Sequence, residues 1–225
     1  KNLELLFDKK ISPMTAIIGG SKISTKLLII HNLIETFDKL IIVGAMANTF
    51  LYSQGYKVGK SLIEKNLRDE VKKILHKAKS QNVEIILPID LICSNNIKDQ
   101  INIKFVDINN ILPDQMALDI GSKTIKLIEE KLLKSNMILW NGPCGAFEFK
   151  PFDYGTNQIA EIIKKNSKAL NILTIAGGGD TVAAIKKCNA ENAFTYISTA
   201  GGAFLEWIEG KDLPGIKALK NNKLF

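Results

Sequence analysis

The sequence predicts an α/β fold in which one Rossmann-like parallel sheet carries helices on both faces, in three layers α/β/α. Short, uniformly apolar runs alternate along the chain with segments whose apolar residues recur every three or four positions, which is the helical period. Strands that are buried on both faces are apolar throughout, and most of these runs end in glycine or a polar turn. No linker or repeat divides the 225 residues, so we expect a single domain over 1–225.

The first half of the chain contains predicted strands that alternate with helices. The helical period is clearest over 64–80, because Val71, Ile74 and Ala78 return to the same face. Pro88 stops the strand over 83–87, because proline has no amide to donate to a neighbouring strand. In chain order we expect a strand at 16–18, a helix from about 21 to 37, a strand at 40–43, a helix at 44–51, a helix at 64–80 and a strand at 83–87.

The second half repeats this alternation after an irregular stretch. Residues 90–115 hold neither period for long, and the pairs Asn95-Asn96 and Asn109-Asn110 are typical of turns, so this stretch predicts short extra strands. Beyond it we expect a helix at 122–134, a strand at 137–140, a helix at 155–165, a strand at 172–176, a helix at 180–187, a strand at 193–197 and a last helix that opens at Gly201-Gly202.

The charge balance bears on the partners of the chain. There are 30 lysine and arginine residues and 23 aspartate and glutamate residues, a formal charge of +7, yet Arg68 is the single arginine. Proteins that read phosphates or base edges by geometry favour the planar guanidinium group. We therefore assign the surplus charge to lysines on solvated helix faces and expect no nucleic-acid partner. A phosphate-rich partner is the alternative.

Cysteine usage and hydropathy bear on the compartment. Cys93, Cys144 and Cys188 are far apart and lack metal-ligand spacing, so we expect neither a disulfide framework nor a zinc site. No apolar run approaches the ~20 residues that span a bilayer. The sequence predicts a cytoplasmic protein without a membrane partner, and we expect a monomer.

Glycine follows most of the predicted strands, and this pattern indicates a polyphosphate ligand. Ligands of open parallel sheets bind beyond the carboxyl ends of the strands. Amides at helix N-termini carry partial positive charge, and glycine lets an anion approach them. Each turn alone is also what a plain strand-to-helix connection would contain, but together they favour phosphates. The glycines are Gly19, Gly20, Gly44, Gly142, Gly177, Gly178, Gly179, Gly201 and Gly202.

Charged residues beside two of these turns suit the same ligand. Lys22 and Lys26 are four apart and would lie on one face of the first turn of the predicted helix. Lysine there opposes the helix dipole and favours an anion, with a Ser21 cap and two solvated lysines as the alternative. Asp180 follows three glycines. A carboxylate there suits Mg²⁺ chelated by phosphate oxygens, and the alternative is an N-cap shared with Thr181.

Glu148 ends the run 140–148, which is too rigid and apolar for an ordinary solvent loop. An acid in this place can accept hydrogen bonds from ribose hydroxyls, as acidic residues do in dinucleotide-binding folds. An ordinary surface acid is the alternative.

Two standard nucleotide motifs are incomplete. Gly59-Lys60-Ser61 matches the end of a P-loop, but Gln54 stands where its first glycine is required. The run 177–179 continues to Val182 rather than to glycine or alanine, so the dinucleotide fingerprint is also incomplete. A Rossmann oxidoreductase is therefore disfavoured.

Four longer runs occur in order: GGSKISTK at 19–26, WNGPCGAFE at 140–148, TIAGGGDT at 174–181 and ISTAGGA at 197–203. Together with the shorter runs at 47–50 and 213–215, they closely resemble phosphoglycerate kinase of the bacterial type. The likeness covers essentially the whole chain and corresponds to the C-terminal, nucleotide-binding half of that enzyme. It implies reversible phosphoryl transfer between 1,3-bisphosphoglycerate and Mg-ADP, which gives 3-phosphoglycerate and Mg-ATP in glycolysis.

The resemblance also implies roles for single residues. Lys26 would contact the nucleotide phosphates, and Lys22 would lie close to the transferring group. Asp180 would hold Mg²⁺ through the nucleotide, and Glu148 would bind the ribose. Further implied contacts are Gly177, Gly178, Gly179 and Thr181 for phosphate oxygens, Gly20, Gly44, Leu118, Asn141 and Pro143 for the nucleoside pocket, and Gly201 and Gly202 for the phosphoryl group in flight.

The chain departs from the family pattern at three positions. Val43 and Ala45 replace glycines on either side of Gly44, which would tighten the adenine side of the pocket. Ala200 stands where the family usually has a third glycine. If that position needs a positive φ, alanine costs on the order of 1 kcal/mol and disturbs the placement of the phosphoryl group.

The resemblance further implies a missing half. In the family, an N-terminal domain with several arginines and a histidine holds the acid substrate. Residues 1–10 would be the end of the connecting helix, and that domain is absent from this chain. We expect the chain to bind ADP or ATP, to meet 1,3-bisphosphoglycerate or 3-phosphoglycerate only through the missing domain, and to turn over weakly or not at all alone. The alternative is a nucleotide-binding module or remnant without catalysis of its own.

Overall fold

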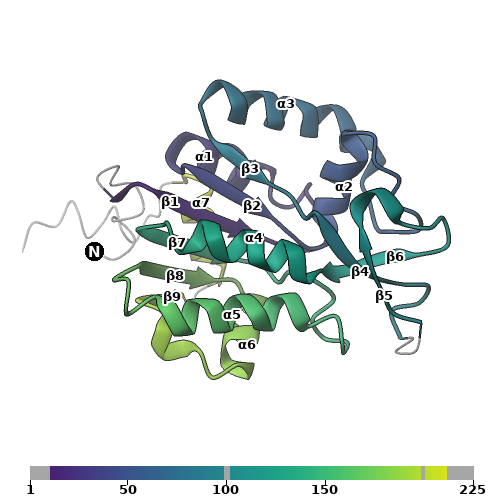
Figure 1. Ribbon diagram of the computed structural model, residues 1–225. Helices are drawn as coiled ribbons and strands as arrows, with labels where there is room; N and C mark the ends of the chain where they lie inside the picture. The colour runs from purple at the N-terminus through teal and green to yellow at the C-terminus, as the bar shows by residue number, and fades with distance from the viewer. Residues whose placement is uncertain (1–10, 99–101, 199–200, 212–225) are drawn as a thin grey trace, which may run out of the picture.

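The computed structural model describes residues 11–98, 102–198 and 201–211. Its centre is a six-stranded sheet in which every pair of neighbouring strands is parallel. The strands are β1 (Met14–Ile18), β2 (Lys39–Ile42), β3 (Glu84–Ile86), β7 (Met137–Asn141), β8 (Leu173–Gly177) and β9 (Tyr196–Ser198). Their order is β3-β2-β1-β7-β8-β9, so the chain winds outward from β1 in one direction and later in the other (Figure 1). This doubly wound order is typical of the Rossmann-like parallel sheet that the sequence predicts.

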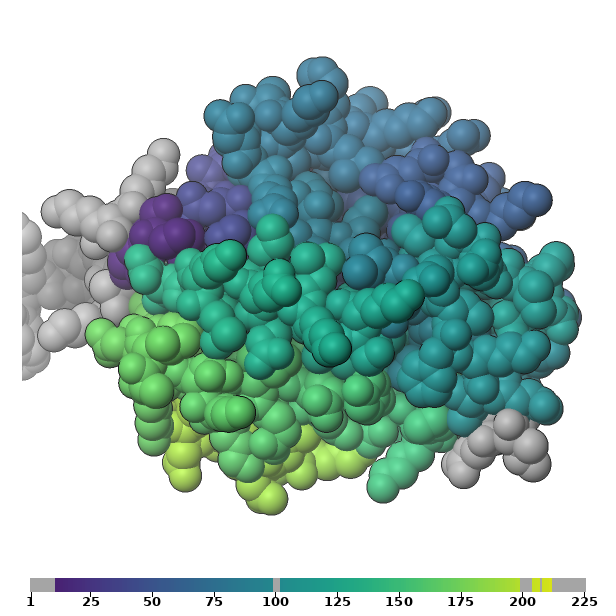
Figure 2. All heavy atoms as spheres, in the orientation of Figure 1, coloured from purple at the N-terminus to yellow at the C-terminus, as the bar shows by residue number. Residues whose placement is uncertain are grey.

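Helices cover both faces of this sheet, as predicted. One face carries α1 (Leu27–Thr36), α2 (Ala45–Ser53), α3 (Arg68–Ser80) and α7 (Gly201–Ile208). The other carries α4 (Ser122–Leu132), α5 (Tyr154–Asn166) and α6 (Gly179–Lys187). Figure 2 shows the second face, where the atoms of α4 and α5 cover the sheet.

The strands are apolar throughout because both of their faces are buried. Along β1, Ala16 and Ile18 pack into the core under α1 and α2, while Ile17 packs into the core under α4 and α5. Along β7, Leu139 and Trp140 divide between the two cores in the same way. Successive side chains of a strand point to opposite faces, so one continuous apolar run supplies two cores.

A small antiparallel sheet, in the order β5-β4-β6, stands beside the main sheet (Figure 1). Its strands are β4 (Asp90–Ser94), β5 (Lys104–Asp107) and β6 (Met116–Ile120). The first two confirm the short extra strands expected over 90–115, whereas β6 was not predicted. Leu51 of α2 packs with Leu91, Cys93 and Ala117 beneath this sheet. The small sheet is therefore fixed to the edge where the parallel strands end.

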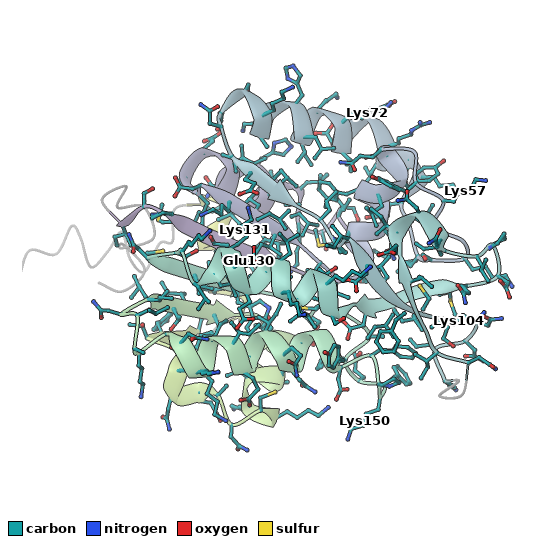
Figure 3. All side chains as sticks on the ribbon, viewed as in Figure 1. Lys57, Lys72, Lys104, Glu130, Lys131 and Lys150 are labelled. Carbon is teal, nitrogen blue, oxygen red and sulfur yellow. The ribbon has the colours of Figure 1, made fainter. Side chains whose placement is uncertain are left out.

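Short 3-10 turns complete the described structure: η3 (Lys65–Leu67), η4 (Ile108–Asn110) and η5 (Glu191–Ala193). The turn η5 corrects the strand expected at 193–197, which is confined to β9 because Ala193 belongs to the turn before it. Surface lysines such as Lys57, Lys104 and Lys150 extend outward, as expected for solvated faces (Figure 3). In the described ranges no helix has both the length and the apolar character needed to cross a membrane.

The first helix begins later than predicted. Residues 21–26 form turns, since the Lys26 amide donates to the Ile23 carbonyl at 2.7 Å, and α1 starts at Leu27. The expectation that Lys22 and Lys26 share a helical face is therefore wrong. Eight residues thus separate the end of β1 from α1, and this connection is long enough to fold back over the edge of the sheet.

Asp90 joins the small sheet to the main domain. Its buried carboxylate accepts hydrogen bonds from the Thr124 amide at 2.7 Å, the Thr124 hydroxyl at 2.6 Å and the Lys123 amide at 3.0 Å. These amides lie in the first turn of α4, where no partner exists within the helix. Asp90 therefore caps α4 from a different element.

Replacing Asp90 with Ala is expected to lower the free energy of unfolding by about 2–3 kcal/mol, because buried donors lose a charged acceptor. Urea unfolding followed by circular dichroism measures this. Asp114→Ala is the matched control, because Asp114 is exposed and accepts a hydrogen bond from Asn95 on the surface. Equal unfolding midpoints for the two variants would contradict the capping role.

Candidate functional site

Three loops meet where β1, β2 and β7 end. The Gly19 amide donates to the Asn141 carbonyl at 2.9 Å, the Gly44 amide to the Cys144 carbonyl at 2.9 Å, and the Met46 amide to the Gly20 carbonyl at 3.0 Å. A Cβ atom at Gly19 would lie 2.0 Å from the Pro143 carbonyl oxygen, so no other residue fits there. The loops therefore form one backbone-bonded floor at the point where the winding direction of the sheet reverses.

A cavity of about 480 Å³ opens above this floor. Ligands of doubly wound sheets bind in this place, outside the carboxyl ends of the strands at the reversal point. Six of the residues predicted as nucleotide contacts line it. They are Gly20, Gly44, Leu118, Pro143, Glu148 and Asp180.

Lys26 lies at the edge of this floor. Its Nζ donates to Oδ1 of Asn141 at 2.5 Å and to the Asn141 carbonyl at 3.2 Å, and the side chain is half-buried. Burial lowers the pKa of Lys26 from 10.5 to about 8, while the negative charge of Asp180 acts in the opposite direction. Lys26 and Asp180 are thus close enough to interact, although they are 154 positions apart (180 − 26).

Asn141 holds this lysine in place. Its side chain is 2% exposed, and its Nδ2 donates to the Gly177 carbonyl at 2.7 Å while its Oδ1 accepts from Lys26. The Gly142 amide donates to Oγ1 of Thr181 at 2.6 Å. Asn141 and Thr181, predicted as direct ligand contacts, are buried and do not line the cavity. Their observed contacts tie the end of β7 to its neighbours.

The turn between β8 and α6 presents a helix N-terminus. Gly178 has a φ of +96°, a conformation that favours glycine, and α6 begins at Gly179, one residue before the predicted start. A Cβ atom at Gly179 would meet nothing within 4 Å, so the approach to this turn is open. Asp180 is exposed and lies in the first turn of α6. Anions are stabilised at such a terminus.

Several predicted contacts besides Asn141 and Thr181 do not line the cavity: Lys22, Lys26, Gly177, Gly178 and Gly179. Lys22 is exposed and does not line it, and its carbonyl accepts from the Thr25 hydroxyl. Gly177 packs against Phe204 of α7, where a Cβ atom would lie 2.1 Å from the ring. Gly201 and Gly202 open α7, as predicted. Ala200 and the segment 1–10 lie outside the described residues.

Of Val43 and Ala45, the two departures beside Gly44, only one lines the cavity. Ala45 lines it, whereas Val43 is fully buried in the core under α4 and α5. Of these two residues, therefore, only Ala45 can narrow the cavity.

The sequence analysis missed part of the cavity wall. Leu62 and Met116 line the cavity, and Leu118 was expected there only from the resemblance. Beneath this wall, Asp119 accepts from the Gly155 amide at 2.7 Å and fixes the start of α5. Burial raises the pKa of Asp119 well above its usual range. An aspartate inside an otherwise apolar strand was the available signal.

The donor set bears on metal binding. Among the described residues, no three histidine, cysteine, aspartate or glutamate side chains gather as an all-protein metal site. Asp180 is an exposed carboxylate in the first turn of α6, and its charge acts on the ammonium group of Lys26. This set fits Mg²⁺ that arrives with phosphate oxygens, because Mg²⁺ commonly takes one or two carboxylates plus substrate phosphates.

Comparisons with known proteins bear on the family. A family model described as phosphoglycerate kinase matches residues 1–211. The chain is 46% identical over 210 residues to the phosphoglycerate kinase of Xanthobacter autotrophicus, a match that covers 93% of this chain and 53% of that protein.

Solved structures agree with the sequence matches. The structure of phosphoglycerate kinase from Coxiella burnetii matches with a TM-score of 0.92 at 38% identity, over 98% of this chain and 56% of that one. The phosphoglycerate kinase of Pyrococcus horikoshii matches with a TM-score of 0.76 at 27% identity, over 97% of this chain and 54% of that one. The chain spans about half the length of the curated relatives it matches. On the strength of these matches, the chain belongs to the phosphoglycerate kinase family.

Proposed function

We propose that this chain is the nucleotide-binding, C-terminal half of a phosphoglycerate kinase. In this role it binds ADP or ATP with Mg²⁺ in the cavity beside Lys26 and Asp180, for reversible phosphoryl transfer with 1,3-bisphosphoglycerate. The observation that carries the proposal is that Lys26 and the turn before α6 are both hydrogen-bonded to Asn141 at the end of β7, with Asp180 in the first turn of α6. An ammonium group, helix amides and a carboxylate are the groups that a magnesium-chelated polyphosphate needs.

The parts of the cavity suit the parts of a nucleotide. The turn before α6 and Lys26 would take the phosphates, since both are positive in character. The wall with Leu118, Pro143 and Ala45 is apolar and would take the base. Glu148 is exposed at the mouth of the cavity, where its carboxylate can accept from ribose hydroxyls.

Phosphoryl transfer depends on positioning and on neutralising charge rather than on covalent chemistry by the protein. Lys26 would hold a terminal phosphate in place, because Asn141 fixes the ammonium group at two oxygens. Bound Mg²⁺ would supply further neutralisation of the phosphate oxygens, and Asp180 would orient it. Gly201 and Gly202, at the start of α7, would stabilise the group in transfer with their amides.

Replacing Asp180 with Ala is expected to weaken Mg-ADP binding about tenfold, because the metal loses its carboxylate partner. Calorimetric titration with and without Mg²⁺ measures this, and binding of metal-free ADP should change little. Asp69→Ala is the matched control, because Asp69 is an exposed aspartate in the first turn of α3. Equal Mg-ADP affinity for wild type and Asp180→Ala would remove Asp180 from the metal role.

A nucleotide-binding module without catalysis is the second candidate. It is favoured by one observation, that Glu148 and Asp180 are exposed and leave the cavity open to water. Nucleotide binding is common to both candidates, so only turnover separates them.

A further inference from the structure

A second cavity, of about 870 Å³, lies away from the glycine turns. Its walls come from the end of α2, the loop 55–59, the start of α3 and the loop 109–113. Ile63 lines this cavity, whereas the preceding residue, Leu62, lines the nucleotide cavity. The two cavities share no lining residue.

The lining combines apolar surface with positive charge. Tyr52, Tyr56 and Ile63 belong to or pack on the small core beneath the antiparallel sheet, and their remaining surface lines the cavity. Lys65 and Arg68, together with Lys57, add cationic groups, and no aspartate or glutamate lines the cavity. Pockets for small organic ligands have this composition, mostly apolar with a few charged groups that fix orientation.

The acids nearest in sequence to this lining are bound to other partners. Asp69 and Glu70, which follow Arg68, pair with Lys72 at 3.8 Å and with Lys73 at 3.2 Å. Glu64 accepts from the Ser24 hydroxyl at 2.5 Å. Asp107 pairs with Lys123 at 2.8 Å, and Asp114 accepts from the Asn95 amide at 2.8 Å. No carboxylate therefore neutralises the cations of the cavity from its own walls.

The three cations are available to a ligand. Within the described parts of the chain, no ion pair joins Lys57, Lys65 or Arg68 to a carboxylate. The Arg68 guanidinium lies 5.8 Å from the centre of the Tyr52 ring, which orients it without neutralising it. All three side chains are exposed. Figure 3 shows Lys57 at the periphery of the molecule.

We propose that this cavity binds a small organic anion with a flat aromatic body. An inorganic anion would leave the tyrosine and isoleucine surface unused, and a neutral aromatic compound would leave the cations unpaired. The volume of about 870 Å³ lies within the range for small-molecule sites. The aromatic body would lie on the apolar wall, and the charged group would face Lys65 and Arg68, the only arginine of the chain.

The test uses 1-anilinonaphthalene-8-sulfonate, an aromatic sulfonate that fluoresces when it is bound to apolar surface. The whole chain is titrated with and without saturating Mg-ADP. We expect one site that persists with Mg-ADP present. The double variant Lys65→Gln/Arg68→Gln should raise its Kd about tenfold, since two exposed ion contacts are lost. N-phenyl-1-naphthylamine, the neutral analogue, should bind at least about tenfold more weakly.

The matched control is Lys72→Gln/Lys79→Gln, which removes the same charge from exposed positions of α3 outside the cavity. All four substituted residues are exposed, so both double variants are expected to fold, and circular dichroism checks this. The proposal is overturned if the two double variants bind the dye equally, if Mg-ADP displaces the dye completely, or if the neutral analogue binds as tightly. The dye is expected in a cavity that shares no lining residue with the nucleotide cavity. The dye test can therefore be carried out and interpreted even if the chain does not bind Mg-ADP.

Discussion

Replacing Lys26 with Met is expected to weaken Mg-ADP binding by about two to three orders of magnitude. Its ammonium group is half-buried and held by two oxygens of Asn141, so a bound phosphate would meet a charge already in position. Removing one partner of a buried, hydrogen-bonded charge pair costs about 2–5 kcal/mol, more than an exposed lysine would contribute. Calorimetric titration of wild type and variant measures the loss.

The pH dependence of Mg-ADP binding tests the role of Lys26 more specifically. Burial lowers the pKa of Lys26 to about 8, so the group is charged below that pH and loses its proton above it. A bound polyphosphate favours the charged form and raises this pKa. By linkage, affinity is highest below about pH 8 and falls by up to about tenfold per pH unit above it, until the pKa of the complex is reached.

Two variants distinguish the titration of Lys26 from other effects of pH on Mg-ADP binding. The Lys26→Met variant should show no fall in affinity between about pH 7 and about pH 9.5, since the titrating group is gone. Lys39→Met is the matched control, because Lys39 is also half-buried but begins β2 at the opposite edge of the sheet. It should retain both wild-type affinity and wild-type pH dependence. A pH profile shared by wild type and Lys26→Met would refute the role of Lys26.

Much of the fold could be predicted because burial on two faces marks a parallel strand. The runs around Ile17, Ile41 and Leu139 are apolar at every position, and the structure places them in neighbouring strands β1, β2 and β7. The strand β6 was missed because its sequence, MALDI, contains an aspartate and is partly exposed. Pairing with β4, which no local pattern encodes, makes it a strand.

The sequence analysis located the glycine turns of the candidate site, because residue type reveals them. It missed the features that depend on contacts between residues far apart in the sequence. Gly44 and Gly178 have positive φ at turns after strands, which their residue type allows. The late start of α1 could not be predicted, because the turn at Lys26 replaces helical bonds with a side-chain link to Asn141, 115 positions away. The family resemblance supplied the expected residue roles, and the structure adds the contacts between some of those residues.

We expect the 225 residues alone to bind Mg-ADP while forming ATP from 1,3-bisphosphoglycerate at a rate on the order of 10³-fold or more below that of a complete enzyme. The acid substrate carries phosphate and carboxylate groups that need several fixed cations. The single arginine, Arg68, lines the second cavity and lies over Tyr52, so it is not placed to hold the acid substrate beside the nucleotide cavity. Lys22, Glu148 and Asp180 are exposed, so the cavity does not by itself exclude water from a phosphoryl group in transfer.

A coupled assay for ATP formation measures this, first on the chain alone and then with the part of the Xanthobacter autotrophicus protein that the chain does not match added. A gain of on the order of 10²-fold or more over either part alone would support the kinase half, because the second part would restore orientation of the acid substrate. The Lys26→Met chain mixed with the same partner is the control, and it should show no gain. Binding of Mg-ADP without any gain in the mixture would favour a module without catalysis. Rapid turnover by the chain alone would contradict the expectation itself, because the cations that hold the acid substrate would then have to lie within these 225 residues.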